Sequence, residues 1–296
     1  MYIKTNDNKK LKGQKMNFNR IMSTIDVEAM QQSHVTIIGG AYGLAKDLVH
    51  SGLGYVTLND FDRIDTSNPA RQDFNSTDMG RYKVEATTDI LRKINPEVQV
   101  ECYMHDYCAL SRQKHDELFG DTDLFIFATD FFPAQARGNI EALRLGIPAI
   151  WIGLYKGGRA GEIIYHVPSK TQACYRCICG KRYHAFQLGR ANVPSDGGTI
   201  FDLHFVDAIV GQIAVGILTD GADNRIGKLI DKLDNRNFMQ VKMDPDYRLG
   251  NKDIFGQYLG NHPANFSFNT IALPVERDKN CPDCSKYQLI NNVLPA

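Results

Sequence analysis

The sequence predicts an α/β fold: a doubly wound, Rossmann-like, mainly parallel sheet, followed by a loop-rich region with antiparallel strands. Short apolar runs alternate with amphipathic stretches from about residue 34 to residue 165, which is typical of strands alternating with helices. A glycine cluster follows the first apolar run, as in many nucleotide-binding sheets. Two Cys-x-x-Cys pairs lie in the second half of the chain and predict a zinc site that staples this region.

The predicted strands are short, apolar and often rich in β-branched residues. The helices between them carry apolar residues at helical spacing, and one ends before Pro96 because a residue that precedes proline avoids the helical conformation. Ligands of such sheets bind at the carboxyl ends of the strands, so we expect the site there. The strands are predicted at 34–39, 54–59, 98–105, 123–130 and 148–155, and the helices at 42–51, 78–94 and 137–145.

Beyond residue 165 the pattern changes. Residues 201–218 form an apolar helix, but Asp202, His204, Asp207 and Gln212 favour a buried or dimer-forming helix over a membrane span. Residues 219–280 are rich in Asp, Asn, Gly and Lys, which predicts loops with a few antiparallel strands.

The chain of 296 residues has 34 basic and 34 acidic side chains, so no net field draws it to nucleic acid or anionic lipid. Residues 1–15 are polar and Lys-rich without an apolar segment, and we expect a disordered arm. Residues 16–296 are expected to form one domain, with a nucleotide-binding half at about 34–165 and a zinc- and substrate-binding half at about 166–296. The odd number of cysteines, 7, and the absence of an export signal favour a reducing cytoplasm.

The glycine cluster alone is a weak signal. Gly39, Gly40 and Gly43 stand between a strand and a helix, where backbone N–H groups can face a phosphate, but the spacing is not Gly-x-Gly-x-x-Gly. An ordinary strand-to-helix turn is the alternative. Asp60 ends the next strand and can accept hydrogen bonds from ribose hydroxyls. To this point a nicotinamide-dependent dehydrogenase explains the pattern equally well.

The stretches 59–74 (NDFDRIDTSNPARQDF), 80–86 (GRYKVEA) and 127–130 (FATD) distinguish these alternatives. Here the chain resembles the ThiF/MoeB/HesA family, the bacterial relatives of ubiquitin-activating enzymes. The resemblance extends from about Phe18 to Cys284 and is most specific over residues 59–86. The residues that match the family pattern are Asp60, Asp62, Ser67, Asn68, Arg71, Gln72, Gly80, Lys83 and Asp130.

The resemblance implies ATP-dependent adenylation of a carboxylate, with release of pyrophosphate. Arg71 and Lys83 are cations that can stabilise charge on the phosphate oxygens, and Asp130 can hold Mg²⁺. Asp60 is expected to bind the ribose, and Asn68 to donate a neutral hydrogen bond. The remaining nucleotide-binding residues implied are Gly39, Gly40, Gly43, Asp62 and Ser67.

Arg20 lies in a stretch, Phe18-Asn19-Arg20, that resembles the family's segment before the first strand. The resemblance implies that Arg20 reaches the ATP phosphates from the neighbouring subunit of a homodimer. The chain also departs from the family: the interval to Asp60 is three residues shorter, Tyr42 stands where the family prefers glycine, and Phe131 replaces an asparagine. These departures leave open a degenerate site.

Cys174, Cys177, Cys281 and Cys284 form the two Cys-x-x-Cys pairs. Four thiolates make a closed tetrahedral site, so the zinc is expected to be structural and to tie the end of the chain to the region after the sheet. Cys179 is expected to be a structural cysteine rather than a ligand.

Residues 180–280 contain no cysteine, although relatives that pass the adenylate to a thiol carry one in this region. The loop at 190–202 offers Ser195, Asp196 and Thr199 instead. The resemblance therefore implies adenylation of the C-terminal carboxylate of a ubiquitin-like β-grasp protein or a small peptide, without a transfer cysteine. The alternatives are a catalytically degenerate scaffold that binds a partner protein and, third, a NAD-dependent dehydrogenase.

Overall fold

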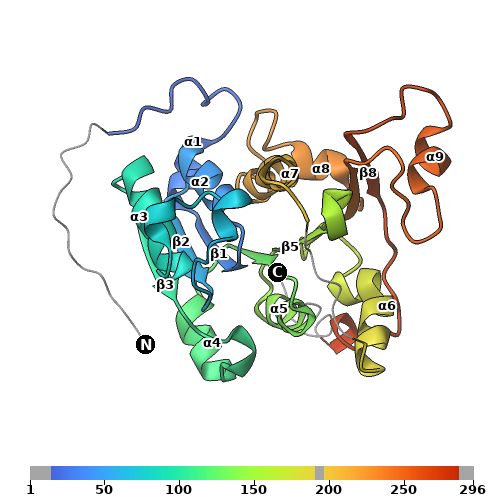
Figure 1. Cartoon of the computed structure of the whole chain (residues 1–296), viewed down its shortest axis with the longest axis horizontal. Helices are drawn as coiled ribbons and strands as arrows, with labels where there is room; N and C mark the ends of the chain where they lie inside the picture. The colour runs from blue at the N-terminus through green and yellow to red at the C-terminus, as the bar shows by residue number, and fades with distance from the viewer. Residues whose placement is uncertain (1–14, 191–196, 287–296) are drawn as a thin grey trace, which may run out of the picture.

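A single eight-stranded sheet forms the centre of the computed structural model, which describes residues 15–190 and 197–286 (Figure 1). The strand order is β3-β2-β1-β4-β5-β6-β7-β8. In this order the first five strands pair in parallel and the last three are antiparallel, so the predicted α/β class with a mainly parallel sheet is confirmed. The strands are β1 (His34–Gly39), β2 (Tyr55–Asn59), β3 (Gln99–Tyr103), β4 (Leu124–Ala128), β5 (Ala149–Leu154), β6 (Ala160–His166), β7 (Phe238–Lys242) and β8 (Asn269–Leu273).

Helices cover both faces of this sheet. The core on one face contains residues of α1, α2, α3, α7 and α8, and the core on the other contains residues of α4, α5 and α6. In Figure 1, α7 lies above β5 and α5 lies below it. The helices are α1 (Val27–Gln32), α2 (Tyr42–His50), α3 (Lys83–Ile94), α4 (Arg112–Phe119), α5 (Phe132–Leu145), α6 (Tyr175–Gln187), α7 (Ile200–Leu218), α8 (Leu229–Leu233) and α9 (Ile254–Leu259), with short 3₁₀ turns η1 (Asn68–Ala70), η2 (Ser76–Asp78), η3 (Tyr107–Ala109) and η4 (Lys156–Gly158).

Two predicted helices begin elsewhere than expected. The helix predicted at 78–94 begins at Lys83, because Asn75 and Asp78 form a capping box around η2 and Gly80 then takes a positive φ of 81°. The helix predicted at 137–145 begins earlier, at Phe132, because Pro133 at the start of the helix already has a helical φ.

Strand β6 and helices α4 and α6 were not predicted. β6 is buried along its whole length and pairs with β5 and β7, so it continues the sheet into the second half of the chain. Strands β7 and β8 are the antiparallel strands expected in residues 219–280. The second half is therefore an extension of the same sheet.

Helix α7 is long and apolar enough to cross a membrane by length and composition, with 39% of its most apolar window buried in the molecule. Its N-terminus is capped by Thr199, whose side chain forms a capping box with Asp202. Its buried side packs against α2, β4, β5 and β6. The helix predicted at 201–218 is thus confirmed as a core helix that also has an exposed side.

Some expectations lie outside the described residues. These are the N-terminal arm, of which only Lys15 is described, and Ser195 and Asp196 of the loop at 190–202.

We predict that Gly138→Ala destabilises the protein, because a Cβ there would lie 2.3 Å from the Phe127 ring of β4. Overpacking of this kind costs about 1 to 3 kcal/mol. Gly180→Ala is the matched control in α6, since a Cβ there meets nothing within 4 Å, and it should stabilise by up to about 1 kcal/mol. Urea unfolding of both variants measures the difference, and equal effects would contradict the packing of α5 on β4.

Candidate functional site

A cavity of about 800 Å³ opens at the carboxyl ends of the parallel strands. Strand β1 lies between β2 and β4, so the strand order reverses at β1: β2 and β3 lie on one side of it, and β4 and β5 lie on the other. Open α/β sheets bind ligands at such a reversal. Side chains and backbone from all three strand ends line the cavity. The predicted residues that line it are Gly39, Gly40, Gly43, Asp60, Asp62, Ser67, Asn68, Arg71, Lys83 and Asp130.

The glycine loop begins with a close backbone contact. Gly39 has a φ of 93°, and a Cβ on it would lie 2.6 Å from the carbonyl oxygen of Ala128. The next residue, Gly40, donates its N–H to the same oxygen at 2.9 Å. Only glycine fits this close approach of β1 to the end of β4. The approach brings the start of α2 to the edge of the cavity.

Tyr42, the first residue of α2, turns its ring into the core. The side chain is 3% exposed and its ring packs on Phe74, with ring centroids 5.2 Å apart. Its hydroxyl donates a hydrogen bond to Oδ2 of Asp60 at 2.6 Å. The bulky residue thus lies beside the glycine loop, with most of its surface against protein.

Asp60 and Asp62 follow β2 and connect the loop to α3. The backbone N–H of Asp62 donates to Oδ1 of Asp60 at 2.9 Å, and Nζ of Lys83 pairs with Oδ2 of Asp62 at 2.9 Å. Burial raises the pKa of Asp60, while the hydrogen bonds from Tyr42 and Asp62 oppose that rise. Lys83 begins α3 and is 9% exposed, so its ammonium is fixed at the cavity wall.

Ser67, Asn68 and Arg71 lie on the segment between β2 and α3. Ser67 donates both its N–H and its hydroxyl to Asp65, and Asn68 Oδ1 accepts the N–H of Asp65. This local turn holds η1, and Asn68 of η1 and Arg71 after it line the cavity.

Asp130 lies beyond the end of β4, next to Phe131 at the start of α5. Phe131 is 50% exposed and also lines the cavity, so an apolar ring stands where the family pattern has an asparagine. Arg20 lies elsewhere: it is exposed, precedes α1, and is not among the residues that line this cavity.

The four paired cysteines converge at the start of α6. Their Sγ atoms all lie within 4.8 Å of one another, and neighbouring sulfurs are 3.7 Å apart. Cys174 caps α6 and Cys177 lies in its first turn, where the helix dipole favours a thiolate. The amide of Asn139 donates to Cys174 Sγ at 3.7 Å and holds this pair against α5.

Cys179 is not part of this four-cysteine cluster. It is buried in the core between α5 and α6, and burial raises its pKa to about 12. None of the seven cysteines forms a disulfide.

A family model described as the ThiF family matches residues 13–237, which is more than half of the chain. The chain belongs to the ThiF family. The resemblance inferred from the motifs of residues 59–86 is thereby confirmed.

Three relatives show the range of named activities in the ThiF family. The chain is 29% identical over 160 residues to a sulfur carrier protein adenylyltransferase of Thermus thermophilus, which covers 52% of this chain and 58% of the relative. It is 29% identical to molybdopterin-synthase adenylyltransferase of Escherichia coli, over 51% of this chain and 60% of the relative. It is 30% identical to ubiquitin-like modifier-activating enzyme 5 of Gallus gallus, over 51% of this chain and 41% of the relative. The matched regions span about half the length of these relatives.

Two solved structures share the fold of this chain. The crystal structure of E. coli MccB with AMPCPP and MccA superposes with a TM-score of 0.64 at 20% identity, covering 87% of this chain and 68% of that chain. PaaA superposes with a TM-score of 0.58 at 19% identity, covering 80% of this chain and 83% of that chain.

A group of charged residues beside the glycine loop was missed in the sequence. Asp73 pairs with Lys46 at 2.8 Å and with Nε2 of His204 at 3.1 Å. Asp73 and His204 line the cavity, and Lys46, which lies in α2, does not. Oδ2 atoms of Asp73 and of Asp207 each lie 3.2 Å from the position that a Cβ on Gly43 would take. The sequence signal was Asp207 itself, a carboxylate within an apolar helix.

The cavity continues along β5, β6 and α6. Here Glu162, which is 4% exposed, accepts hydrogen bonds from Arg182 and from the hydroxyl of Tyr155, both at 2.5 Å. The sequence signal for this pair was Glu162 itself, a carboxylate within an otherwise apolar run. A buried carboxylate needs a cation or hydrogen-bond donors beside it, and here Arg182 and Tyr155 supply them.

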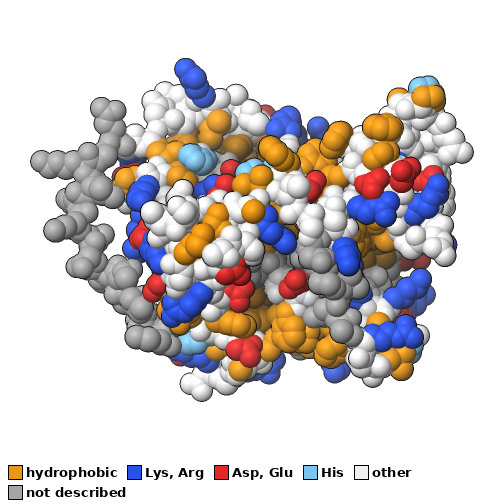
Figure 2. Space-filling view, viewed as in Figure 1, with side chains coloured by type: hydrophobic (Ala, Val, Ile, Leu, Met, Phe, Trp, Pro, Cys, Tyr) orange, Lys and Arg blue, Asp and Glu red, His pale blue; other side chains and the backbone are white. Residues whose placement is uncertain are grey.

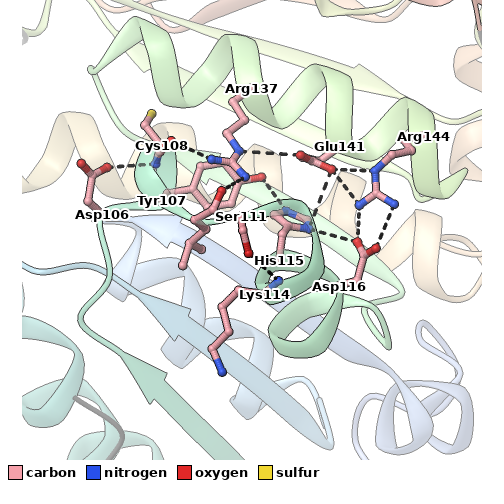
Figure 3. Close-up of polar contacts among 11 residues, drawn as sticks. Asp106, Tyr107, Cys108, Ser111, Lys114, His115, Asp116, Arg137, Glu141 and Arg144 are labelled. Atoms are coloured by element: carbon pink, nitrogen blue, oxygen red, sulfur yellow. Dashed lines mark hydrogen bonds and ion pairs between the residues drawn. The ribbon is translucent and has the colours of Figure 1, made fainter.

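An ion-pair network holds the wall formed by η3 (Figure 3). Arg137 of α5 donates to the backbone carbonyls of Cys108 and Leu110 at 2.7 and 2.6 Å, which fixes the segment whose Asp106 and Tyr107 line the cavity. His115 of α4 contacts the Tyr107 hydroxyl through Nε2 at 3.0 Å. The wall therefore depends on residues outside the cavity.

The same network contains a cluster of potential metal ligands, His115, Asp116 and Glu141. Nδ1 of His115 is buried without a hydrogen bond, 3.8 and 3.9 Å from the two carboxylates. Arg144 forms ion pairs with both carboxylates, and Arg137 pairs with Glu141 (Figure 3). Two guanidinium groups already balance the two carboxylates, so a dication there would add uncompensated charge.

We predict that Asp207→Asn stabilises the protein more at pH 8 than at pH 5. Burial raises the pKa of Asp207 to about 7, with further contributions from Asp47 and Asp73. A carboxyl with a raised folded-state pKa favours the folded state at low pH, and this contribution falls as the pH rises to the folded pKa. The gain on substitution should therefore grow by about 2 to 3 kcal/mol between pH 5 and pH 8.

Urea unfolding at both pH values measures this gain. Asp121→Asn, a change at an exposed carboxylate away from the cavity, is the control and should give the same small effect at both pH values. A gain for Asp207→Asn that does not depend on pH would show that this carboxyl is not buried as described.

Proposed function

We propose that this chain catalyses ATP-dependent adenylation of the C-terminal carboxylate of a carrier protein or peptide. The observation that carries the proposal is the convergence of the glycine loop, Asp60, Arg71, Lys83 and Asp130 in one cavity. Relatives named as adenylyltransferases for a sulfur carrier and for molybdopterin synthase support it. An ordinary strand-to-helix turn would not require cations and carboxylates from four segments around it.

Each wall of the cavity has a role in this chemistry. Asp60, at the end of β2, accepts hydrogen bonds from the ribose. Arg71 and Lys83 face the phosphates and stabilise the negative charge that grows as the carboxylate attacks the α-phosphorus and pyrophosphate leaves. Asp130 is the residue that would hold Mg²⁺, which supplies charge neutralisation on the phosphate oxygens.

The carboxylate substrate is expected to enter along β5, β6 and α6, where the cavity extends away from the glycine loop. A ubiquitin-like protein or a peptide has a narrow tail that suits this extension. None of the described residues that line the cavity is a cysteine, which supports transfer of the acyl group to an external nucleophile.

We further propose that the four-cysteine cluster binds structural zinc. Four sulfurs at about 2.3 Å from one zinc ion lie about 3.8 Å apart in a tetrahedron, close to the 3.7 Å separations found here. Asp283 lies between the second pair of cysteines and bonds to Asn139 and Arg176, so neighbouring residues also hold the cluster together.

The assembly proposed is a cytoplasmic homodimer. Phe201 of α7 is 80% exposed. Phe268, just before β8, is 69% exposed, and its ring contacts Phe205 of α7. A second copy covering these rings would bury them, and in such a dimer Arg20 would reach the partner's cavity. Charges of both signs are mixed on the face in Figure 2, and such a surface does not favour nucleic acid.

Lys83→Met and Asp130→Asn should each reduce pyrophosphate exchange by at least about 100-fold, because each removes charge stabilisation at the phosphates. The assay uses Mg-ATP, labelled pyrophosphate, and a panel of candidate substrates, namely β-grasp proteins and peptides that end in Gly-Gly. Lys114→Met is the control and should keep full exchange, because the Lys114 side chain is partly exposed on α4 and does not line the cavity. Full activity in both cavity variants would refute the assigned roles.

A lack of exchange with every substrate tested, together with ATP binding, would favour the non-catalytic scaffold. Tight nicotinamide binding without ATP binding would favour the dehydrogenase.

Cys281→Ser should lower zinc content and stability together, because binding of thiolates to zinc is coupled to folding. Metal analysis and thermal unfolding measure both quantities. Cys179→Ser is the control, since Cys179 is buried but outside the cluster, and it should keep its zinc. Far less than one zinc per wild-type chain would contradict this proposal.

A further inference from the structure

Tyr42, which begins α2 beside the glycine loop, holds Asp60, the carboxylate that follows β2. The Tyr42 hydroxyl donates to Oδ2 of Asp60 at 2.6 Å, and the backbone N–H of Asp62 donates to Oδ1 at 2.9 Å. The Tyr42 ring cannot turn easily, because it is buried and packed on Phe74. Asp60 is therefore fixed in one orientation, with each oxygen bound by one donor.

The acceptor capacity of Asp60 then matches a vicinal diol. An ionised carboxylate has about four lone-pair sites, and Tyr42 and Asp62 occupy two of them. The 2′- and 3′-hydroxyls of a ribose supply two more donors. A 2′-deoxyribose supplies one, which leaves a lone pair of a largely buried carboxylate without a donor, and that is unfavourable.

Tyr42 also favours the charged form of this acceptor. Burial raises the pKa of Asp60, and the largest opposing contribution is the hydrogen bond from Tyr42, followed by the backbone N–H of Asp62. Asp62 also raises this pKa through its charge, while Lys83 lowers it. Without the hydroxyl, Oδ2 of Asp60 would lose its donor, and the N–H of Asp62 alone would hold the carboxylate.

We propose that Tyr42 is a specificity-determining residue, which orients Asp60 so that the cavity selects a ribonucleotide over its 2′-deoxy analogue. This inference rests on the proposed function, since it concerns how the same site binds ATP. It assigns a role to the residue by which this chain departs from the glycine of the family pattern.

The opposite interpretation is that Tyr42 obstructs the nucleotide. The two interpretations predict opposite changes in ATP affinity when Tyr42 is replaced by alanine. If the ring obstructs the site, Tyr42→Ala strengthens ATP binding. If it orients Asp60, both Tyr42→Ala and Tyr42→Phe weaken ATP binding and reduce the preference for ribose.

The test is calorimetric titration of the full chain with Mg-ATP and with Mg-2′-deoxyATP at pH 7.5. The wild type should bind ATP about tenfold more tightly, as expected for one unsatisfied buried acceptor. Tyr42→Phe, which keeps the ring, should reduce this ratio to about threefold or less. Tyr165→Phe is the matched control, because Tyr165 is also a buried tyrosine with one hydrogen bond, to the Arg236 carbonyl, and does not line the cavity.

The possible outcomes are distinct. An unchanged ratio in Tyr42→Phe, or tighter ATP binding by Tyr42→Ala, would overturn this inference and leave the proposed function intact. Failure of the wild type to bind either nucleotide would overturn the proposed function and this inference with it. A loss of the ratio in Tyr42→Phe but not in Tyr165→Phe supports the proposal, and melting curves show that each variant is folded.

Discussion

The close approach of Gly39 to the carbonyl of Ala128 is the constraint on which the cavity depends. It places the end of β1 against the end of β4, and the N–H of Gly40 then uses the same carbonyl oxygen. Because β1 also pairs with β2, the ends of three strands meet within one small region. The start of α2, the carboxylates after β2 and Asp130 after β4 are neighbours as a consequence, although they are far apart in the sequence.

The second half of the chain is joined to this region in two ways. Strand β6 continues the sheet from β5 and contributes Glu162 to the cavity, and α7 packs on α2 and contributes Asp207. The four-cysteine cluster joins the residues after β6 to Cys281 and Cys284 near the end of the described chain. The proposed tail-binding half therefore shares its sheet and its core packing with the proposed nucleotide half.

The sequence predicted most of what local chemistry determines. Apolar runs identified β1, β2, β4 and β5, and the motifs of residues 59–86 identified residues that do line one cavity. It did not predict contacts that tertiary packing decides. The direction of the Tyr42 ring depends on Phe74, and the importance of Arg137 depends on two carbonyls of η3. Strand β6 was missed because glycine and glutamate interrupt its apolar pattern, and the helix at 78–94 was set too early because Gly80 takes a positive φ.

The most direct test of the account is a crystal structure of the chain with Mg²⁺ and a non-hydrolysable ATP analogue. We expect the ribose hydroxyls on Asp60, the phosphates between the glycine loop and the side chains of Arg71 and Lys83, and the metal at Asp130. A nucleotide bound elsewhere, or a cavity that stays empty at saturating analogue, would contradict it.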